Sequence, residues 1–361
     1  MSKARTGNFF EDFHIGMQIQ HPTPRTLTEG DRSLYIGLTG SRDAVASAES
    51  VSRRLGYEQR PIEALLLFNI AFGKTVPDIS LNASANLGYA DVRFVQPVYA
   101  GDTLSVTSDV IGLRETSNGN AGIVYVRSVA INQRDEEVLS WVRWVMIHKK
   151  NKGEFTGVNV TPQLPAAVAV QHYLTLNPGP AADAMFKATG STCFWEDYEV
   201  GERIDHLSGM TINDSDHSIA TRLYQNTARA HFDGYMMASA DVKQRLVYGG
   251  HVISLCKALS YDGIENAVAI LAMNSGTHVS PTFAGDTLVC ATQVIEKIDL
   301  AHKHMGALRL RLLGAKNLGS ASRITFPSPT ESKPVYQPEI VLDLDYVIAI
   351  PKKTNQQGAT S

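Results

Sequence analysis

The most reactive combination of side chains lies in the segment from Leu223 to Asp233, which reads LYQNTARAHFD. The imidazole of His231 titrates near neutral pH, so it can take up a proton and later return it. Asn226, five residues earlier, cannot accept a proton, but its amide oxygen and NH2 group can position a polar group. These residue types suit general acid–base chemistry. The alternative interpretation of His231 is a partly buried, hydrogen-bonded histidine on a polar loop.

A glycine pair follows at Gly249 and Gly250, directly after Tyr248. The pair opens an apolar stretch whose side chains recur at the spacing of one helical face: Val252, Leu255, Cys256 and Leu259. Backbone N–H groups at the start of a helix favour negative charge, so this pair could donate hydrogen bonds to an oxyanion. The alternative interpretation is a tight loop that only leads into the helix.

Several well-known catalytic motifs are absent from the sequence. It contains no GxGxxG after a strand, no GxxxxGK[ST], no HExxH and no GxSxG. Motif support is therefore lacking for nucleotide-cradling loops, zinc proteases and serine hydrolases. The three cysteines, Cys193, Cys256 and Cys290, have no CxxC spacing, so neither a disulfide framework nor a zinc site is indicated.

An internal repeat organises the chain. Phe94–Ile111 reads FVQPVYAGDTLSVTSDVI, and His278–Ile295 reads HVSPTFAGDTLVCATQVI. A second match at almost the same offset relates Phe9–His21, FFEDFHIGMQIQH, to Phe194–His206, FWEDYEVGERIDH. The repeat is too long for a solenoid unit and indicates a duplicated domain. We predict an N-terminal domain at residues 1–150, a linker rich in Pro, Ala and Gly at 151–189, and a C-terminal domain at 190–361.

Both halves have the same order of elements. Amphipathic helices are predicted at Glu29–Leu38 and Asp214–Leu223, each followed by a loop and a strongly apolar helix, which is Leu65–Phe72 in the first half. The strands expected after these helices are Ile123–Val129, Glu137–Ile147, Ala307–Leu313 and Ile340–Ile350. Each half is thus predicted to be an α+β unit, in which one buried helix packs on a curved antiparallel sheet. In the shared AGDTL run, we expect Asp102 and Asp286 to be structural rather than catalytic.

Composition narrows the function further. The chain has 361 residues and a formal net charge of −3, with 33 basic and 36 acidic side chains. That balance argues against a dedicated nucleic-acid binder, which usually carries a basic excess. No apolar run is long enough to span a membrane, and the start resembles no signal peptide, so the cytoplasm is the expected location.

The pattern N-x4-H followed by a glycine segment resembles that of the MaoC-like, (R)-specific enoyl-CoA hydratases of the hot dog fold. In that family an acid, usually Asp, precedes the catalytic His by five residues. His231 matches the family His, whereas Asn226 stands where Asp is usual. The resemblance covers both halves and implies a double hot dog, with each sheet wrapped around a central helix. It also implies an acyl-CoA thioester as the substrate.

Longer strings resemble the mesaconyl-CoA hydratase branch of that family, in which QNTA-x-x-HF replaces the usual motif. These strings include RTLTEGDRSLY, FGKTVPDISLNASANLGYADVRF, LYQNTARAHF, RLVYGGHVISL and LDLDYV. The resemblance implies reversible addition of water to mesaconyl-C1-CoA (2-methylfumaryl-CoA) to give β-methylmalyl-CoA, with no metal or redox cofactor. The expected partners are the CoA ester and, in a homodimer, a second copy of the chain.

The substrate of this branch carries a free carboxylate, which a guanidinium can bind in a bidentate manner. Arg222, Arg229 and Arg245 are candidates, and Arg229 is preferred because it is nearest to His231 in the sequence; the alternative is an ordinary surface charge. Tyr248 and Asp233 are further candidates for substrate binding or loop orientation.

The first half lacks the motif. Ser41 stands opposite Asn226 and Ala46 opposite His231, so we expect one active site per chain.

Three other functions remain open. One is a hot dog thioesterase, which would release free thiol from a CoA ester. Another is an (R)-specific enoyl-CoA hydratase for a different short acyl-CoA. A noncatalytic acyl-CoA binding protein would turn over no enoyl-CoA at all.

Overall fold

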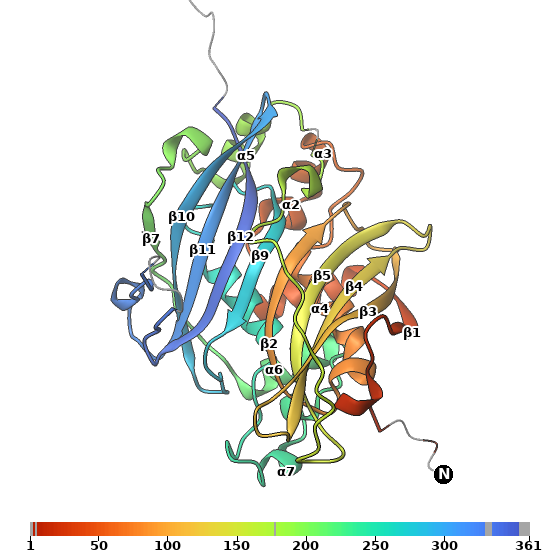
Figure 1. Ribbon diagram of the computed structural model, residues 1–361. Helices are drawn as coiled ribbons and strands as arrows, with labels where there is room; N and C mark the ends of the chain where they lie inside the picture. The colour runs from red at the N-terminus through yellow and green to blue at the C-terminus, as the bar shows by residue number, and fades with distance from the viewer. Residues whose placement is uncertain (1–2, 4–5, 177, 329–333, 354–361) are drawn as a thin grey trace, which may run out of the picture.

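The computed structural model describes residues 3, 6–176, 178–328 and 334–353. Its twelve strands form one sheet in which every pair is antiparallel, and whose main path runs β1-β3-β4-β5-β2-β9-β12-β11-β10-β7 (Figure 1). The strands are β1 Gln18–Thr26, β2 Ala83–Phe94, β3 Thr103–Glu115, β4 Ala121–Ile131, β5 Glu137–His148, β6 Asn159–Val160, β7 Arg203–Asp205, β8 Met210–Thr211, β9 Ala269–His278, β10 Thr287–His302, β11 Met305–Lys316 and β12 Ile340–Pro351. The short strands β6 and β8 pair with β3 and β10.

The strand order shows the duplication. The first five strands of the path come from the N-terminal half and the last five repeat them in reverse order from the C-terminal half. The two halves join where β2 pairs with β9, with Tyr89 opposite Gly276 and Val92 opposite Met273. The double hot dog that the sequence predicted is confirmed, and the sheet continues from one half into the other.

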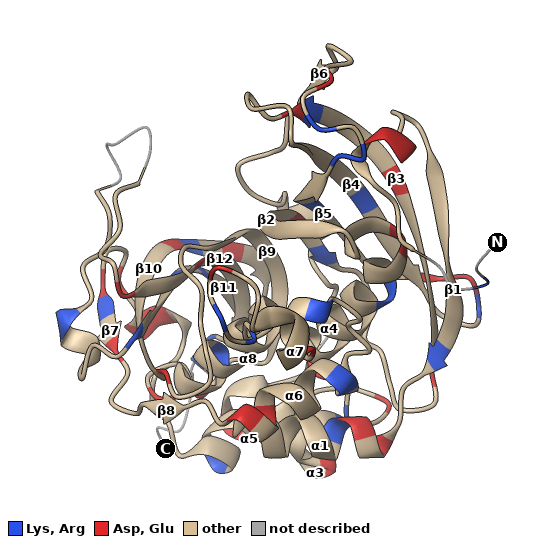
Figure 2. Ribbon diagram, turned by 90° about the horizontal axis from the view of Figure 1, so that it is seen from below, with Lys and Arg blue, Asp and Glu red and all other residues tan. Residues whose placement is uncertain are grey.

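The helices are α1 Glu29–Thr39, α2 Ala44–Ser47, α3 Glu49–Arg54, α4 Ala64–Thr75, α5 Ala181–Thr189, α6 Asp214–Leu223, α7 Gly234–Met237 and α8 Gly249–Leu259. Single helical turns occur at Phe10–Asp12, Val76–Ser80, Val170–His172, Trp195–Asp197, Arg229–His231 and Ala321–Arg323. Figure 2 shows α4 and α8 inside the curve of the sheet, with α1 and α6 beyond them. In the described part of the chain, no helix is both long and apolar enough to cross a membrane.

The two central helices are buried because their sequences are apolar. In α4 every residue from Leu65 to Thr75 is buried, which agrees with the apolar character predicted for this helix. The helices meet at Asn69, whose Nδ2 donates to the Gly250 carbonyl oxygen at 3.1 Å and to Ser254 Oγ at 3.0 Å. The two halves therefore share one core as well as one sheet.

The linker has more structure than the sequence indicated. Within residues 151–189, β6 pairs with the end of β3 that extends beyond its pairing with β1. The helix α5 packs through Met185, which is fully buried, against a core that includes Val347 of β12. The Ala-rich composition of α5 favours a helix, and its contacts with the outer face of the sheet stabilise it. In the AGDTL turns, Asp102 accepts the N–H of Tyr99 and Asp286 that of Phe283, both at 2.9 Å, as expected of structural residues.

Candidate active site

One cavity of about 320 Å³ gathers most of the predicted site residues. Asn226, His231, Tyr248 and Gly249 line it from the C-terminal half. Residues of α4, the Val76–Ser80 turn, β2 and β5 line it from the N-terminal half: Phe72, Val76, Ser80, Ala83, Ser84, Ala85, Asn86, Tyr89, Arg143 and Val145. The site is therefore built by both halves, although the dyad comes from only one.

A single hydrogen bond fixes the chemical form of His231. Its Nδ1 lies 3.0 Å from the carbonyl oxygen of Leu246. Because a carbonyl oxygen only accepts, Nδ1 carries the hydrogen and Nε2 keeps its lone pair. Burial lowers the pKa of His231 to about 4, against the smaller opposing effect of the Leu246 hydrogen bond. At neutral pH the ring is therefore neutral and has Nε2 available as a base.

Asn226 is held by its own loop. Its Oδ1 accepts the backbone N–H of Ala228 at 2.9 Å, and its backbone N–H donates to the carbonyl oxygen of Thr221 at 3.1 Å. Gln225 before it has a positive φ of 52°, a conformation that non-glycine residues rarely adopt. With Oδ1 engaged, the Nδ2 group is the part of this side chain with donor capacity left for a ligand.

The N-terminal half braces this loop. A Cβ atom placed on Gly73 of α4 would lie 2.0 Å from the carbonyl oxygen of Tyr224, so only glycine lets α4 approach the backbone just before Asn226. This contact sets the distance between the Asn226 loop and α4 of the other half.

The two glycines of the pair pack against different residues. Gly249 is the first residue of α8 and lines the cavity, and a Cβ atom on it would lie 2.3 Å from Nε2 of His278. Gly250 does not line the cavity; it lies against Asn69, whose Oδ1 would be 1.9 Å from an added Cβ. Of the pair, Gly249 rather than Gly250 therefore lies at the cavity wall.

Four further predicted residues lie outside the cavity lining. Arg229 is exposed, and Asp233 caps α7 by accepting the N–H of Met236 at 2.9 Å. Arg245 pairs with Asp214 of α6, while exposed Arg222 donates to the carbonyl oxygen of Ser218. Of the predicted substrate-binding set, Tyr248 reaches the cavity, where its ring packs 5.5 Å from the ring of His231.

Among the cavity residues that the sequence analysis missed are four with polar rings, an amide or a guanidinium. His278 of β9 and Tyr89 of β2 form a hydrogen bond of 2.9 Å between Nε2 and the hydroxyl, and burial lowers the pKa of His278 to about 4. Asn86 and Arg143 are the other two. A signal for His278 was present in the repeat, because the first half has Phe94 at the same position.

Comparison with known proteins agrees with this architecture. The family model described as Mesaconyl-CoA hydratase matches residues 2–316. The chain belongs to the mesaconyl-CoA hydratase family.

Relatives in this family match over nearly their full length. The β-methylmalyl-CoA dehydratase of Chloroflexus aurantiacus is 47% identical, over 98% of this chain and 99% of that protein. The mesaconyl-CoA hydratase of Cereibacter sphaeroides is 44% identical, over 97% of this chain and 100% of that protein. A solved structure of a MaoC domain dehydratase from Chloroflexus aurantiacus superposes with a TM-score of 0.92 at 46% identity, covering 98% of this chain and 100% of that one. A Mycobacterium tuberculosis protein with a double hotdog fold shares the fold at 22% identity and a TM-score of 0.76, over 95% of this chain and 98% of that one.

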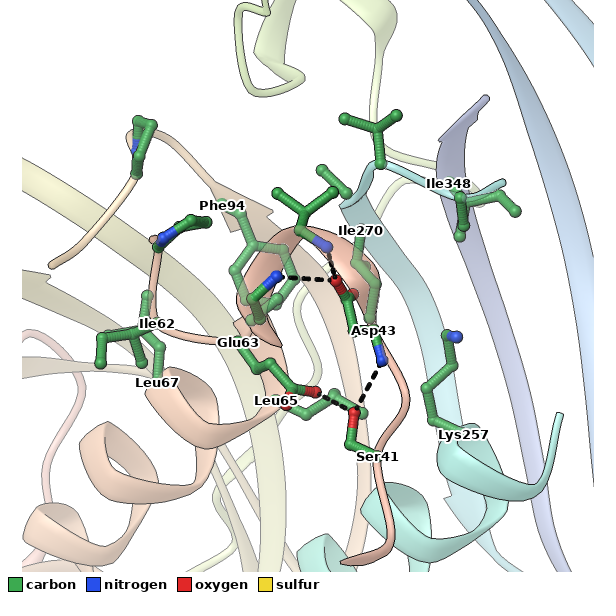
Figure 3. Close-up of a pocket in the computed structure, with 18 of the residues that line it drawn as sticks. Ser41, Asp43, Ile62, Glu63, Leu65, Leu67, Phe94, Lys257, Ile270 and Ile348 are labelled. Atoms are coloured by element: carbon green, nitrogen blue, oxygen red, sulfur yellow. Dashed lines mark hydrogen bonds between the residues drawn. The ribbon is translucent and has the colours of Figure 1, made fainter. Parts of the chain in front are cut away.

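A second cavity, of about 90 Å³, occupies the corresponding place in the N-terminal half of this family member. Ser41 and Ala46 line it in place of the dyad. Asp43, Glu63 and Lys257 line the same cavity, as Figure 3 shows. Ser41 Oγ donates to Glu63 Oε2 at 2.9 Å, and burial, with a smaller contribution from Asp43, raises the pKa of Glu63 to about 8. The lining of this cavity includes carboxylates, whereas that of the other includes histidines and amides.

Proposed function

We propose that the cavity around His231 catalyses the reversible hydration of mesaconyl-C1-CoA to β-methylmalyl-CoA. The observation that carries the proposal is the tautomer of His231: the Leu246 carbonyl leaves Nε2 as a neutral base inside a cavity that also contains Asn226. The high identity to proteins named β-methylmalyl-CoA dehydratase and mesaconyl-CoA hydratase supports the choice of substrate. The protein is thus a hydro-lyase.

In the hydration direction, Nε2 of His231 takes a proton from water while the water oxygen attacks the β-carbon. The electron pair of the C=C bond moves toward the thioester, and negative charge develops on the thioester oxygen. The N–H of Gly249, at the start of α8, is the donor that we assign to this oxygen. The protonated His231 then delivers its proton to the α-carbon, which completes the addition and restores the neutral ring.

Asn226 positions the reactants in this scheme. Because its Oδ1 already accepts the Ala228 N–H, we assign its Nδ2 group to the attacking water or to an oxygen of the substrate. Adding water to a double bond transfers no electrons to an acceptor, so the proposed reaction requires no redox cofactor. The partner that it requires is the CoA ester, while a cytoplasmic location and a homodimeric state stay predictions from the sequence.

The test is to incubate the purified protein with mesaconyl-CoA, and separately with β-methylmalyl-CoA. A hydratase lowers the enoyl-thioester absorbance in the first reaction and raises it in the second, without releasing free thiol. Release of free thiol would instead identify a thioesterase, and no change in either reaction would identify a binding protein.

A further inference from the structure

The formal charge in the lining of the His231 cavity is positive. Of the described residues that line it, Arg143 alone carries a formal charge near neutral pH, because burial lowers the pKa of both His231 and His278 to about 4. No aspartate or glutamate is among those residues. The cavity wall therefore has one cation and no anion.

Arg143 comes from β5 of the N-terminal half and is fully buried. Its guanidinium donates to Thr75 Oγ1 at 2.8 Å and to Ser80 Oγ at 3.3 Å, and it lies 4.2 Å from the ring centre of Phe72. Burial lowers the pKa of Arg143 to about 10, so the side chain is still a cation at neutral pH. Across the residues that the structure describes, the side-chain acceptors of its hydrogen bonds are these two hydroxyl groups rather than a carboxylate, and its Nε has no acceptor.

A buried cation without an anionic partner is unfavourable unless its surroundings compensate for lost hydration. Two hydroxyl groups and one aromatic face compensate Arg143 only in part, because none of them carries a full negative charge. The same wall also presents Asn86, whose side-chain nitrogen and oxygen are both buried without a hydrogen-bond partner. A guanidinium and an amide NH2 together form a donor set that suits a carboxylate.

We propose that Arg143, assisted by Asn86, selects substrates that carry a free carboxylate on the β-carbon of the acyl group. This inference rests on the proposed function for the reaction and adds the residues that select a substrate by its charge. Arg143 attracts the carboxylate from the cavity wall, and the lack of acidic residues in the lining leaves that attraction unopposed. The assignment moves carboxylate recognition from Arg229, which is exposed, to the half of the chain that lacks the dyad.

The test compares two substrates that differ in one group. Tigloyl-CoA is mesaconyl-C1-CoA with a methyl group in place of the carboxylate. We expect Arg143→Met to lower kcat/KM for mesaconyl-CoA by about 30-fold or more, the range for truncating one partner of a buried charge pair. For tigloyl-CoA, kcat/KM should change less than about threefold. Arg143→Lys keeps the charge and should restore part of the activity on mesaconyl-CoA.

The matched control is Lys257→Met, which removes a cation from the other cavity. Any effect of that change should be equal for the two substrates. Equal losses on both substrates in Arg143→Met, or no loss on either, would overturn the proposal and leave Arg143 a packing residue.

Binding to the wild-type protein gives a result that needs no variant and no turnover. We expect 2-methylsuccinyl-C1-CoA, the saturated analogue, to bind at least about tenfold more tightly than uncharged 2-methylbutyryl-CoA in calorimetry at pH 7. Equal affinities would refute the charge selection. Charge-dependent binding without hydration of mesaconyl-CoA would instead refute the proposed function alone, so the two failures are distinguishable.

Discussion

Replacing Asn226 with Asp tests why this family member has an amide where the wider MaoC-like family has a carboxylate. The change preserves the local fold, since an Asp oxygen can accept the Ala228 N–H that Asn226 Oδ1 accepts at 2.9 Å. The other oxygen then replaces an amide donor with a negative charge, in a cavity lining that has no carboxylate among its described residues. Asn226 is only 5% exposed, so solvent screens the new charge weakly.

The size of the effect follows from Coulomb's law. The substrate carboxylate sits on the β-carbon that water attacks, so we take a separation of about 4 Å and an effective dielectric constant of about 20, which gives a repulsion of about 4 kcal/mol. That is roughly a thousandfold in kcat/KM. Attraction of the new Asp to Arg143, and partial protonation of a buried Asp, both reduce the effect. We therefore expect a loss of about 10-fold to 1000-fold on mesaconyl-CoA.

The assay is kcat/KM for mesaconyl-CoA and tigloyl-CoA at pH 7, with folding checked by circular dichroism. Activity on tigloyl-CoA should hold or rise, because that substrate has no charge to repel and gains an extra base near the water. Thr227→Asp is the control, since it adds the same charge at an exposed neighbour that does not line the cavity. If Asn226→Asp lowers activity on both substrates in equal proportion, charge avoidance is not the reason for Asn226 and its role is geometric.

The remaining predictions concern the base, the bracing contact and the division between the halves. His231→Gln should lower kcat by about 10² to 10⁴ while the protein stays folded, and a folded variant with more than about a tenth of wild-type activity would contradict its assignment as the base. Because the pKa of His231 is lowered from 6.5 to about 4, kcat/KM for tigloyl-CoA should stay level from pH 8 down to about pH 5 and fall only below that, whereas a fall centred near pH 6.5 would show a solvated base. The unfolded chain binds a proton at His231 more readily than the folded chain does, so this residue should lower the free energy of unfolding as pH falls from 6.5 to 4 and have no such effect above pH 6.5. Denaturation midpoints measured at several pH values check this expectation. Gly73→Ala should lower kcat/KM by about tenfold or more, because the new Cβ would lie 2.0 Å from the Tyr224 carbonyl oxygen. The control is Gly37→Ala in α1, where an added Cβ has no neighbouring atom within 4 Å, and this variant should keep its activity. Equal behaviour of the two variants would refute the bracing role. Ser41→Ala should leave turnover nearly intact. Residues 190–361 expressed alone should be insoluble, because β9 loses its partner strand β2 and exposes a sheet edge. A soluble and active fragment would show that the halves are independent.

Much of the scaffold was predictable because its periodicity is strong. The helix predicted at Asp214–Leu223 has those bounds in the structure, and the four predicted strands correspond to β4, β5, β11 and β12. The apolar helix at Leu65–Phe72 extends only a few residues further, over Ala64–Thr75. In these segments the side chains on the buried face are apolar, so the spacing of apolar residues in the sequence predicts the type of secondary structure. The α5 helix escaped prediction because its nine residues are stabilised by packing on the sheet rather than by a clear period.

The part of the site on the C-terminal half was predictable from spacing, whereas the wall from the N-terminal half was not. Tyr89 and Arg143 reach the cavity only because β2 pairs with β9 and so brings the two half-sheets into one surface, a pairing that no local pattern specifies. One signal was nevertheless available for Arg143. It lies on β5 at every-second-residue spacing between Trp141 and Val145, both fully buried, so the alternation places a charge among core positions.

Position-by-position differences between the halves explain why both are needed. His231 and His278 line one cavity where the first half has Ala46 and Phe94, and Glu63 lines the other where the second half has Tyr248.

Aligning VLSWVR of β5 with VLDLDY of β12 sets Tyr346 opposite Arg143. In an assembly of identical hot dog units, each unit would have to supply both the base and the cation. Duplication removes that constraint, because the base can stay in one half while the other half changes freely. The N-terminal half need not transfer protons and can supply Arg143, so the proposed selection of a charged substrate depends on the two halves being different.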